Sequence, residues 1–182
     1  MITIEFPDKT TREFPSGSNS IDIAKNISEG LARNVLGAKI NGVIIDASKS
    51  LIDGSKIKLE LLTWDNDEGK SIMWHSSAHL MAEAIEFFYP KVKFAIGPPI
   101  ENGFYYDMEF PENSNFSSDE FPKIEKKIIE LAREKNRYQI SYVSKKDAIK
   151  YFKEKNNQYK LELIDNLNDG EITFYKQGRF ID

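Results

Sequence analysis

Two histidines, His75 and His79, are the residues whose type and spacing best fit a chemical role. They are the only histidines in the chain, and they stand four residues apart in a stretch with helical periodicity. Residues four apart in an α-helix are separated by roughly 40° around the axis and lie one turn apart, so both imidazoles face the same way. Such a pair can act together on a metal ion, a water molecule or a substrate oxygen.

A stand-alone metal hydrolase is one activity that paired histidines suggest, and the rest of the sequence argues against it. The helix motif of zinc proteases places Glu directly after the first His, where this chain has Ser76. The chain has no cysteine and no third histidine, whereas zinc sites normally use three or four protein ligands. We therefore expect no metal ligand set here, and the pair is either a hydrolytic site or an ordinary feature of a helix.

The helix that positions the two histidines is predicted from about Ser71 to Pro90, whose ring prevents continuation. Its apolar residues have the spacing of a buried stripe, and the histidines lie at one edge of that stripe, a position that suits a cleft. The polar, aperiodic segment 63–70 precedes the helix and reads as a linker. We accordingly predict two domains, at residues 1–62 and 63–182.

Residues 1–62 have the pattern of a small β-grasp unit. A hairpin is expected over residues 2–14, a helix capped by Ser20, a second hairpin turning at Asn41-Gly42, and a strand over 56–61 after a turn at Asp53-Gly54. This order of strands and helix is that of ubiquitin-like folds. Nothing in it looks catalytic, so it is either a docking module or a packing unit.

The segment after the histidine helix combines stiff and aromatic residues. Gly97 permits close backbone approach, two prolines follow, and Asn102-Gly103 returns the chain as a hairpin carrying Tyr105 and Tyr106. Such a wall with aromatic edges suits a small pocket. The alternative is a plain hairpin whose aromatic side chains fill the core.

The remaining chain predicts further helices and strands, which makes the whole an α+β protein. A helix capped by Ser118 is expected over 119–135, a strand over 138–143 and a terminal hairpin over 172–182, while 159–164 fits either a strand or a helix. Because the sequence stops inside the second strand of that hairpin, we expect a fragment of a longer protein.

Composition narrows the class of protein. Hydrophobic residues make up 40% of the 182 residues, which is typical of globular proteins. We find no run long enough for a membrane helix and no signal peptide, and therefore expect a cytoplasmic protein without a membrane partner. The net charge is −4, but residues 119–160 carry 12 basic and 7 acidic side chains, so only this segment could favour phosphates. Mixed charges on long helices are more often simply solvated.

Five segments together resemble the N-terminal region of bacterial threonyl-tRNA synthetases. They are His75-Ser76-Ser77-Ala78-His79-Leu80, Ala95-Ile96-Gly97-Pro98, residues 100–107, Tyr159-Lys160 and Phe180-Ile181-Asp182. The resemblance covers essentially the whole chain, with 1–62 similar to the TGS domain and 63–182 similar to the editing domain, cut short at its C-terminal end.

The resemblance implies hydrolysis of mischarged Ser-tRNA(Thr), within a parent enzyme that attaches threonine to tRNA(Thr) with ATP. It gives His75, His79, Lys160 and Asp182 catalytic roles. The histidines would orient water and the terminal ribose, Lys160 would supply positive charge near the ester, and Asp182 would hold the aminoacyl group. The residues implied to line the pocket are Gly97, Tyr105, Tyr106 and Asp107.

The resemblance also implies what surrounds this site. The partners would be the acceptor end of tRNA(Thr) and its seryl-adenosine moiety, and the parent enzyme would be a homodimer through domains beyond this sequence. No cofactor is expected here, since ATP and zinc would belong to the catalytic domain. The family continues after the position of Asp182 with a Cys-Arg-Gly-Pro-His element, which this sequence lacks, so a non-catalytic RNA-docking module remains the alternative.

Overall fold

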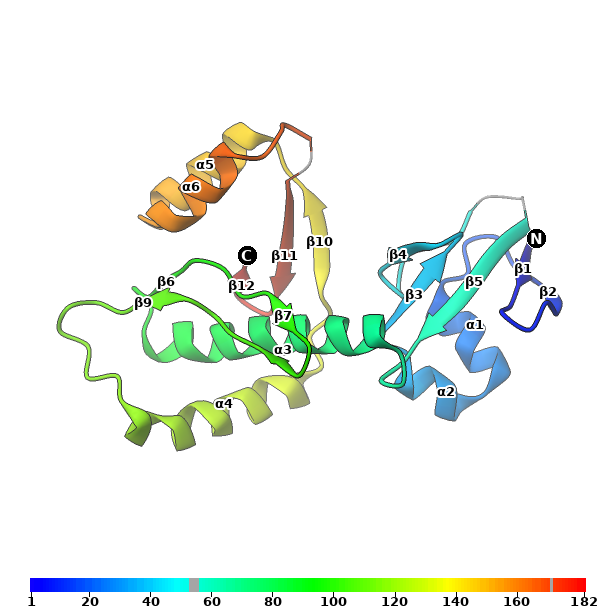
Figure 1. The fold of residues 1–182 in the computed structure, drawn as a ribbon, viewed down its shortest axis with the longest axis horizontal. Coiled ribbons are helices and arrows are strands. Elements are labelled where there is room, and N and C mark those ends of the chain that lie inside the picture. Colours follow the sequence, from blue (N-terminus) through cyan, green and yellow to red (C-terminus); the bar gives the residue numbers. More distant parts are fainter. Residues whose placement is uncertain (53–55, 171) are drawn as a thin grey trace. The chain divides into compact units, whose positions relative to one another are not determined.

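The computed structural model describes residues 1–52, 56–170 and 172–182 of an α+β chain (Figure 1). The chain divides into two compact units, Met1–Met73 and Trp74–Asp182. The boundary between them falls inside one long helix, Asp67–Phe88. The turn expected at Asp53-Gly54 lies outside the described residues.

The first unit is built on a five-stranded sheet in the order β2-β1-β5-β3-β4. The strands are β1 (Ile2–Glu5), β2 (Thr11–Phe14), β3 (Gly37–Ile40), β4 (Val43–Ile45) and β5 (Lys56–Leu62). The central pair β1 and β5 is parallel, and the other pairs are antiparallel. Helices α1 (Ser20–Ile27) and α2 (Glu29–Asn34) connect β2 to β3. This arrangement confirms the predicted β-grasp fold.

Local sequence explains most of the turns in this unit. Asn41 and Gly42 both adopt positive φ, 50° and 87°, as the hairpin prediction required. The cap of α1 is Asn19 and not Ser20, because the Asn19 side chain accepts the Asp22 amide while Asp22 binds the Asn19 amide in return. Ser20 is instead the first helical residue and is buried.

The histidine helix, α3, spans Asp67–Phe88 and begins earlier than expected. Only Thr63–Asn66 form a turn before it, so the second half of the linker predicted over 63–70 is helix. Gly69 makes the early start possible, since a Cβ at this position would lie 1.8 Å from the carbonyl oxygen of Thr63. The acidic side chains of Asp67 and Glu68 lie in the first turn, where they stabilise the helix by interacting with the positive end of its dipole.

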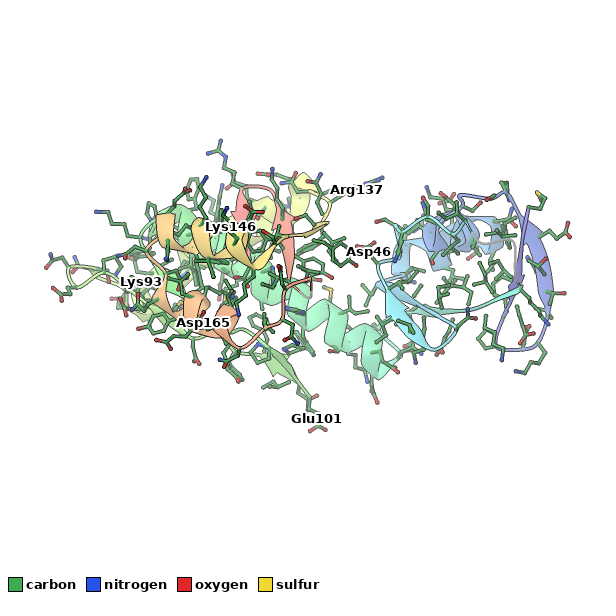
Figure 2. All side chains as sticks on the ribbon, turned by 90° about the horizontal axis from the view of Figure 1, so that it is seen from above. Asp46, Lys93, Glu101, Arg137, Lys146 and Asp165 are labelled. Atoms are coloured by element: carbon green, nitrogen blue, oxygen red, sulfur yellow. The ribbon has the colours of Figure 1, made fainter. Side chains whose placement is uncertain are left out.

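The second unit surrounds α3 with short strands and a second long helix. Helix α4 (Phe121–Glu134) runs beside α3 in Figure 1, and Ile124 and Leu131 of α4 share a buried core with Ala78, Ala82 and Ile85 of α3. The connecting segment forms β6 (Lys93–Phe94) paired with β9 (Met108–Glu109), and the hairpin β7 (Pro99–Ile100) with β8 (Gly103–Phe104). Glu101 lies at the tip of this hairpin (Figure 2).

A three-stranded antiparallel sheet, β10-β11-β12, closes the second unit. Its strands are β10 (Gln139–Tyr142), β11 (Thr173–Gln177) and β12 (Phe180–Ile181), with α5 (Lys145–Glu154) and α6 (Gln158–Asp165) between β10 and β11. On one face of this sheet, Phe174 contacts Tyr151 and Phe152 of α5. The opposite face is the one that belongs to the site described below.

Residues 159–164, which fitted either a strand or a helix, lie in α6. One expected helix start needs correction. The helix expected from Asp119 starts at Phe121, after a 3₁₀ turn over Ser118–Glu120 that is capped by Ser117 and not by Ser118. Among the described residues, we find no helix that combines the length and apolar character needed to cross a membrane.

Candidate active site

Helix α3 brings His75 and His79 into direct contact. Their Nε2 atoms lie 3.2 Å apart, so one nitrogen donates a hydrogen bond to the other, which confirms that both rings lie on one face of the helix. The two differ in access, because His75 is exposed whereas His79 is only 6% exposed. A ligand can therefore reach His75, with His79 behind it.

His79 lies in an aromatic enclosure. The rings of Tyr138, Tyr175 and Phe180 stand edge-on to it at centroid distances of 6.3, 6.4 and 5.9 Å. Its Nδ1 is buried and has no hydrogen-bond partner among the described residues. Burial lowers the pKa of His79 to about 4, against the opposing effect of the Asp182 carboxylate. His79 is therefore a neutral imidazole at pH 7.

The carboxylate of Asp182 lies close to side chains from three other parts of the second unit. It lies just beyond β12, where its backbone exchanges two hydrogen bonds with Tyr175. Its carboxylate forms an ion pair with Lys160 of α6, accepts a hydrogen bond of 2.7 Å from the Tyr106 hydroxyl, and lies 3.9 Å from Nε2 of His79. All four residues predicted as catalytic thus lie together, and we call Asp182, Lys160, Tyr106 and the two histidines the Asp182 cluster.

Gly97 lies directly against the ring of Tyr106, a member of this cluster. A Cβ on Gly97 would lie 2.5 Å from the ring of Tyr106, so the glycine lets that ring lie directly against the backbone. The Tyr106 ring also packs edge-on against Phe94, at 5.1 Å. Burial and the Asp182 charge raise the pKa of Tyr106, so its hydroxyl keeps its proton and remains a donor to the carboxylate.

Asn157 positions Lys160, a role that we did not predict from the sequence. It is 6% exposed and caps α6 by accepting the Lys160 amide at 3.2 Å. Its side-chain nitrogen donates to the Phe94 carbonyl at 2.9 Å, which ties α6 to β6. An Asn three residues before a lysine at a helix start was the available signal.

Glu83 is a second positioning residue that we did not predict. It lies one turn after His79 on α3, is 7% exposed, and accepts the backbone amide of Arg179 at 3.1 Å. Gly178, between β11 and β12, has a φ of 52°, and a Cβ there would meet the Glu83 carboxylate at 2.2 Å. Glu83 therefore fixes the turn that places β12 and, beyond it, Asp182. Burial raises the pKa of Glu83.

Comparisons with known proteins identify relatives of this chain. Residues 2–60 match the TGS domain family. Over its full length, the chain is 56% identical to a threonine-tRNA ligase of Cytophaga hutchinsonii and 46% identical to one of Parabacteroides distasonis. The chain is homologous to the N-terminal part of threonine-tRNA ligases. It spans 28% of the length of these two relatives.

Two predicted pocket residues, Tyr105 and Asp107, flank Tyr106 but differ from it in burial. Tyr105 is 45% exposed and Asp107 is also exposed, while Tyr106 between them is buried. In the part of the chain that the structure describes, no side-chain hydrogen bond or ion pair joins either residue to the cluster. The backbone of Asp107 instead pairs with Ala95 and Ile96 at 2.9 Å each.

The second unit also contains a cavity of about 910 Å³, and Asp182 is among the residues that line it. Glu86, Lys93, Glu109 and Lys155 are among its lining residues, and they form two ion pairs, Lys93 with Glu109 at 2.6 Å and Lys155 with Glu86 at 2.8 Å. His75, His79 and Lys160 do not line it. Within the described ranges, no three His, Asp or Glu side chains are grouped to hold a metal ion.

The buried neutral state of His79 predicts how stability depends on pH. Between pH 6.5 and about 4, an unfolded His79 binds a proton that the folded state excludes, so acidification favours unfolding by up to about 3 kcal/mol. We expect His79→Gln to remove this pH-dependent contribution to the free energy of unfolding. Urea unfolding of both proteins from about pH 7 to about pH 4 measures the difference.

The control for this measurement is His75→Gln. Burial lowers the pKa of His75 in the same direction, but His75 is the more exposed of the two, so its substitution should change the pH dependence less. A free-energy difference between wild type and His79→Gln that stays constant across this pH range would contradict the prediction.

Proposed function

We propose that residues 63–182 form an editing domain that hydrolyses the aminoacyl ester of mischarged Ser-tRNA(Thr) and releases serine and tRNA(Thr). The observation that carries this proposal is the Asp182 cluster. It combines a neutral, exposed imidazole, a second imidazole hydrogen-bonded to it, a lysine, a tyrosine hydroxyl and a carboxylate within one site.

The chemistry needs a water molecule that attacks the ester carbonyl and a group that takes its proton. His75 suits this role, because its Nε2 contacts His79 while its Nδ1 has no protein partner in the described structure. When Nδ1 of His75 accepts the proton, Nε2 of His75 donates to Nε2 of His79. The nearby Asp182 carboxylate stabilises the imidazolium that forms. The bond from the carbonyl carbon to the ribose oxygen then breaks, and the imidazolium returns the proton to that oxygen.

Lys160 and Tyr106 provide donors at the same place. Lys160 has three N–H groups, of which its ion pair with Asp182 does not use all, so one remains to bind the developing oxyanion or the leaving oxygen. Asp182 is engaged by Lys160 and Tyr106 at once, and can accept the ammonium group of the aminoacyl moiety only on its remaining lone pairs.

A separate hydrolytic site has a physical reason in this enzyme class. Serine lacks one methyl group of threonine, and one methylene-sized difference in a pocket is worth only about 1–3 kcal/mol. A synthetic site that binds threonine therefore accepts some serine, and hydrolysis at a second site restores accuracy. The relatives' name, threonine-tRNA ligase, is what leads us from an ester-hydrolysing site to this substrate.

The test is a chimera in which this chain replaces the corresponding 28% of the Cytophaga hutchinsonii ligase. We expect the chimera to deacylate Ser-tRNA(Thr) and to spare Thr-tRNA(Thr), and the 182-residue chain alone to be much slower. Equal hydrolysis of both esters by the chimera would refute the editing assignment. A chain that matched the chimera would show that no segment beyond residue 182 is required.

The longer protein is proposed to attach threonine to tRNA(Thr) with ATP, as a cytoplasmic homodimer. In this proposal the partners of the present chain are the acceptor end of the tRNA and its seryl-adenosine moiety. ATP and zinc would bind to parts of the ligase outside this sequence, and the editing site itself would use no cofactor.

A non-catalytic RNA-docking role is the second candidate, and unpaired cations favour it. Of the 12 basic residues in 119–160, five are committed to carboxylates or carbonyls: Lys123, Lys127, Lys145, Lys155 and Lys160. The other seven have no such partner in the described ranges. A His75→Ala chimera that keeps its tRNA affinity while losing deacylation would separate docking from catalysis.

A further inference from the structure

The sheet β10-β11-β12 presents one continuous face to the Asp182 cluster. Directly opposed residues of antiparallel strands point to the same side, and Tyr175 is paired with Ile140 on β10 and with Asp182 beyond β12. The next pair on this face is Tyr142 with Thr173. This face, which we call the β10 face, therefore runs from Asp182 across Tyr175 to Ile140 and Tyr142.

The inner end of the β10 face belongs to the candidate active site. Tyr138, two residues before Ile140, stands edge-on to His79 and donates its hydroxyl to the Ser76 carbonyl at 2.7 Å. Phe180, opposite Gln177, contacts His79 as well. The aromatic side chains that enclose His79 thus come from the same face that continues outward to Tyr142.

The outer end of the β10 face is exposed. Tyr142 is 73% exposed and Ile140 is 41% exposed, whereas Phe174 on the opposite face is packed against α5. In the described part of the chain, the Tyr142 hydroxyl makes no hydrogen bond and the ring packs against no other aromatic ring. An aromatic ring that is placed on a strand and left uncovered is available for a planar ligand.

Positive charges without ion pairs flank the exposed part of β10. Arg137 precedes the strand by two residues, and Lys146 follows it by four (Figure 2). Both are exposed, and neither has an acidic partner within the ranges that the structure covers. A stacking ring beside cations is the combination by which proteins bind single-stranded nucleic acids, since every base has a π-face and every linkage carries a phosphate.

We propose that Tyr142 stacks on a base upstream of the terminal nucleotide, in a single-stranded RNA 3′ end whose terminal ribose lies at the histidine pair. This inference rests on the proposed function. Neighbouring strands lie about 4.8 Å apart, so β10 is roughly 10 Å across the sheet from Asp182. The base of the terminal nucleotide is held close to the ester, and Tyr142 is left for the nucleotides before it.

The test compares two non-hydrolysable probes on the 182-residue chain. One is adenosine with serine joined to its 3′ position by an amide, and the other is the trinucleotide cytidine-cytidine-adenosine with the same serine amide. We expect Tyr142→Ala to weaken trinucleotide binding about tenfold and to leave nucleoside binding unchanged. Tyr142→Phe, which keeps the ring, should bind both probes like wild type.

The matched control is Phe121→Ala, which removes another exposed aromatic ring, 51% exposed, on α4. It should affect neither probe. A trinucleotide with 2-aminopurine in place of the middle base adds a direct readout, because stacking on Tyr142 quenches its fluorescence and Tyr142→Ala should restore it.

Outcomes for this inference and for the proposed function are distinguishable. Unchanged trinucleotide affinity in Tyr142→Ala, an equal loss for both probes, or no preference of wild type for the trinucleotide would each overturn the stacking role. The proposed function is judged separately by the deacylation rate of His75→Ala in the ligase chimera. If that variant deacylates Ser-tRNA(Thr) like wild type while Tyr142→Ala loses the trinucleotide, stacking stands and the proposed hydrolytic site is wrong.

Discussion

His75→Ala in the ligase chimera is expected to slow deacylation of Ser-tRNA(Thr) by about 10²- to 10⁴-fold, the usual contribution of a positioned acid or base. The reason is access. His75 is the exposed member of the pair, with Nε2 held by His79 at 3.2 Å and Nδ1 without a protein partner in the described structure. Single-turnover deacylation of preformed Ser-tRNA(Thr) measures this loss without interference from the synthetic site.

The control is Ser71→Ala, which changes an exposed residue one turn earlier on α3. It should leave the rate unchanged, because Ser71 lies four residues before His75 and outside the Asp182 cluster. Retention of wild-type deacylation by His75→Ala would remove the histidine from the mechanism and with it the main support for the editing proposal.

His79 should behave differently, because we infer that it acts through His75. His79→Gln keeps an acceptor for the His75 ring but cannot become cationic, so we expect a smaller loss of rate together with a changed pH–rate profile. A merely structural role would lower the rate without moving that profile. The two histidines, equivalent in the sequence pattern, thus have separable roles in the structure.

Features set by local sequence were largely predictable. The shared face of His75 and His79 follows from helical periodicity alone, and the hairpin at Asn41-Gly42 follows from the tolerance of these residues for positive φ. The errors were small shifts along the chain, such as the cap at Asn19 instead of Ser20. Neighbouring polar residues compete for one capping position, and only the relative geometry of backbone and side chain decides between them.

Features that depend on distant residues were not predictable from the pattern. Tyr106 and Asp182 are 76 residues apart in sequence yet share a hydrogen bond, and only the family resemblance suggested that they belong to one site. The buried side chains of Glu83 and Asn157 were missed because their partners are backbone groups of Arg179 and Phe94. No residue type in the sequence marks such backbone partners.

The charge pattern shows the same limit. Lys127 is one of the 12 basic residues counted in 119–160, but its ammonium group pairs with Glu130 at 3.1 Å and lies 4.1 Å from the centre of the Phe87 ring. A count of charges cannot distinguish such a lysine from Lys146, which has no partner in the described ranges.

The ion pair between Lys160 and Asp182 gives the second large expected effect. We expect Lys160→Met to lower the local free energy of unfolding by about 3 kcal/mol, because it leaves a carboxylate in a nearly buried site without its cation. This loss is at the lower end of the range for breaking a buried ion pair, about 3–5 kcal/mol, because the two side chains are still 14% and 13% exposed. Asp182→Asn should cost a similar amount, as it leaves the lysine charge unpaired.

The double variant Lys160→Met/Asp182→Asn decides whether pairing is the cause. It contains neither charge, and the side-chain amide oxygen that replaces the carboxylate still accepts the Tyr106 hydroxyl, so we expect it to be more stable than the sum of the single losses predicts. Hydrogen exchange of the Tyr175 amide, which donates to the Asp182 carbonyl at 2.8 Å, reports the local opening.

The Leu36 amide in the first unit, bonded to the Leu62 carbonyl at 2.8 Å, serves as the internal reference for this exchange measurement and should not change. Strictly additive losses in the double variant would mean that the two residues stabilise the site through separate packing contacts. Lys160 would then be free to give its whole charge to the substrate, whereas a strong coupling means that binding an aminoacyl ammonium group at Asp182 must compete with Lys160.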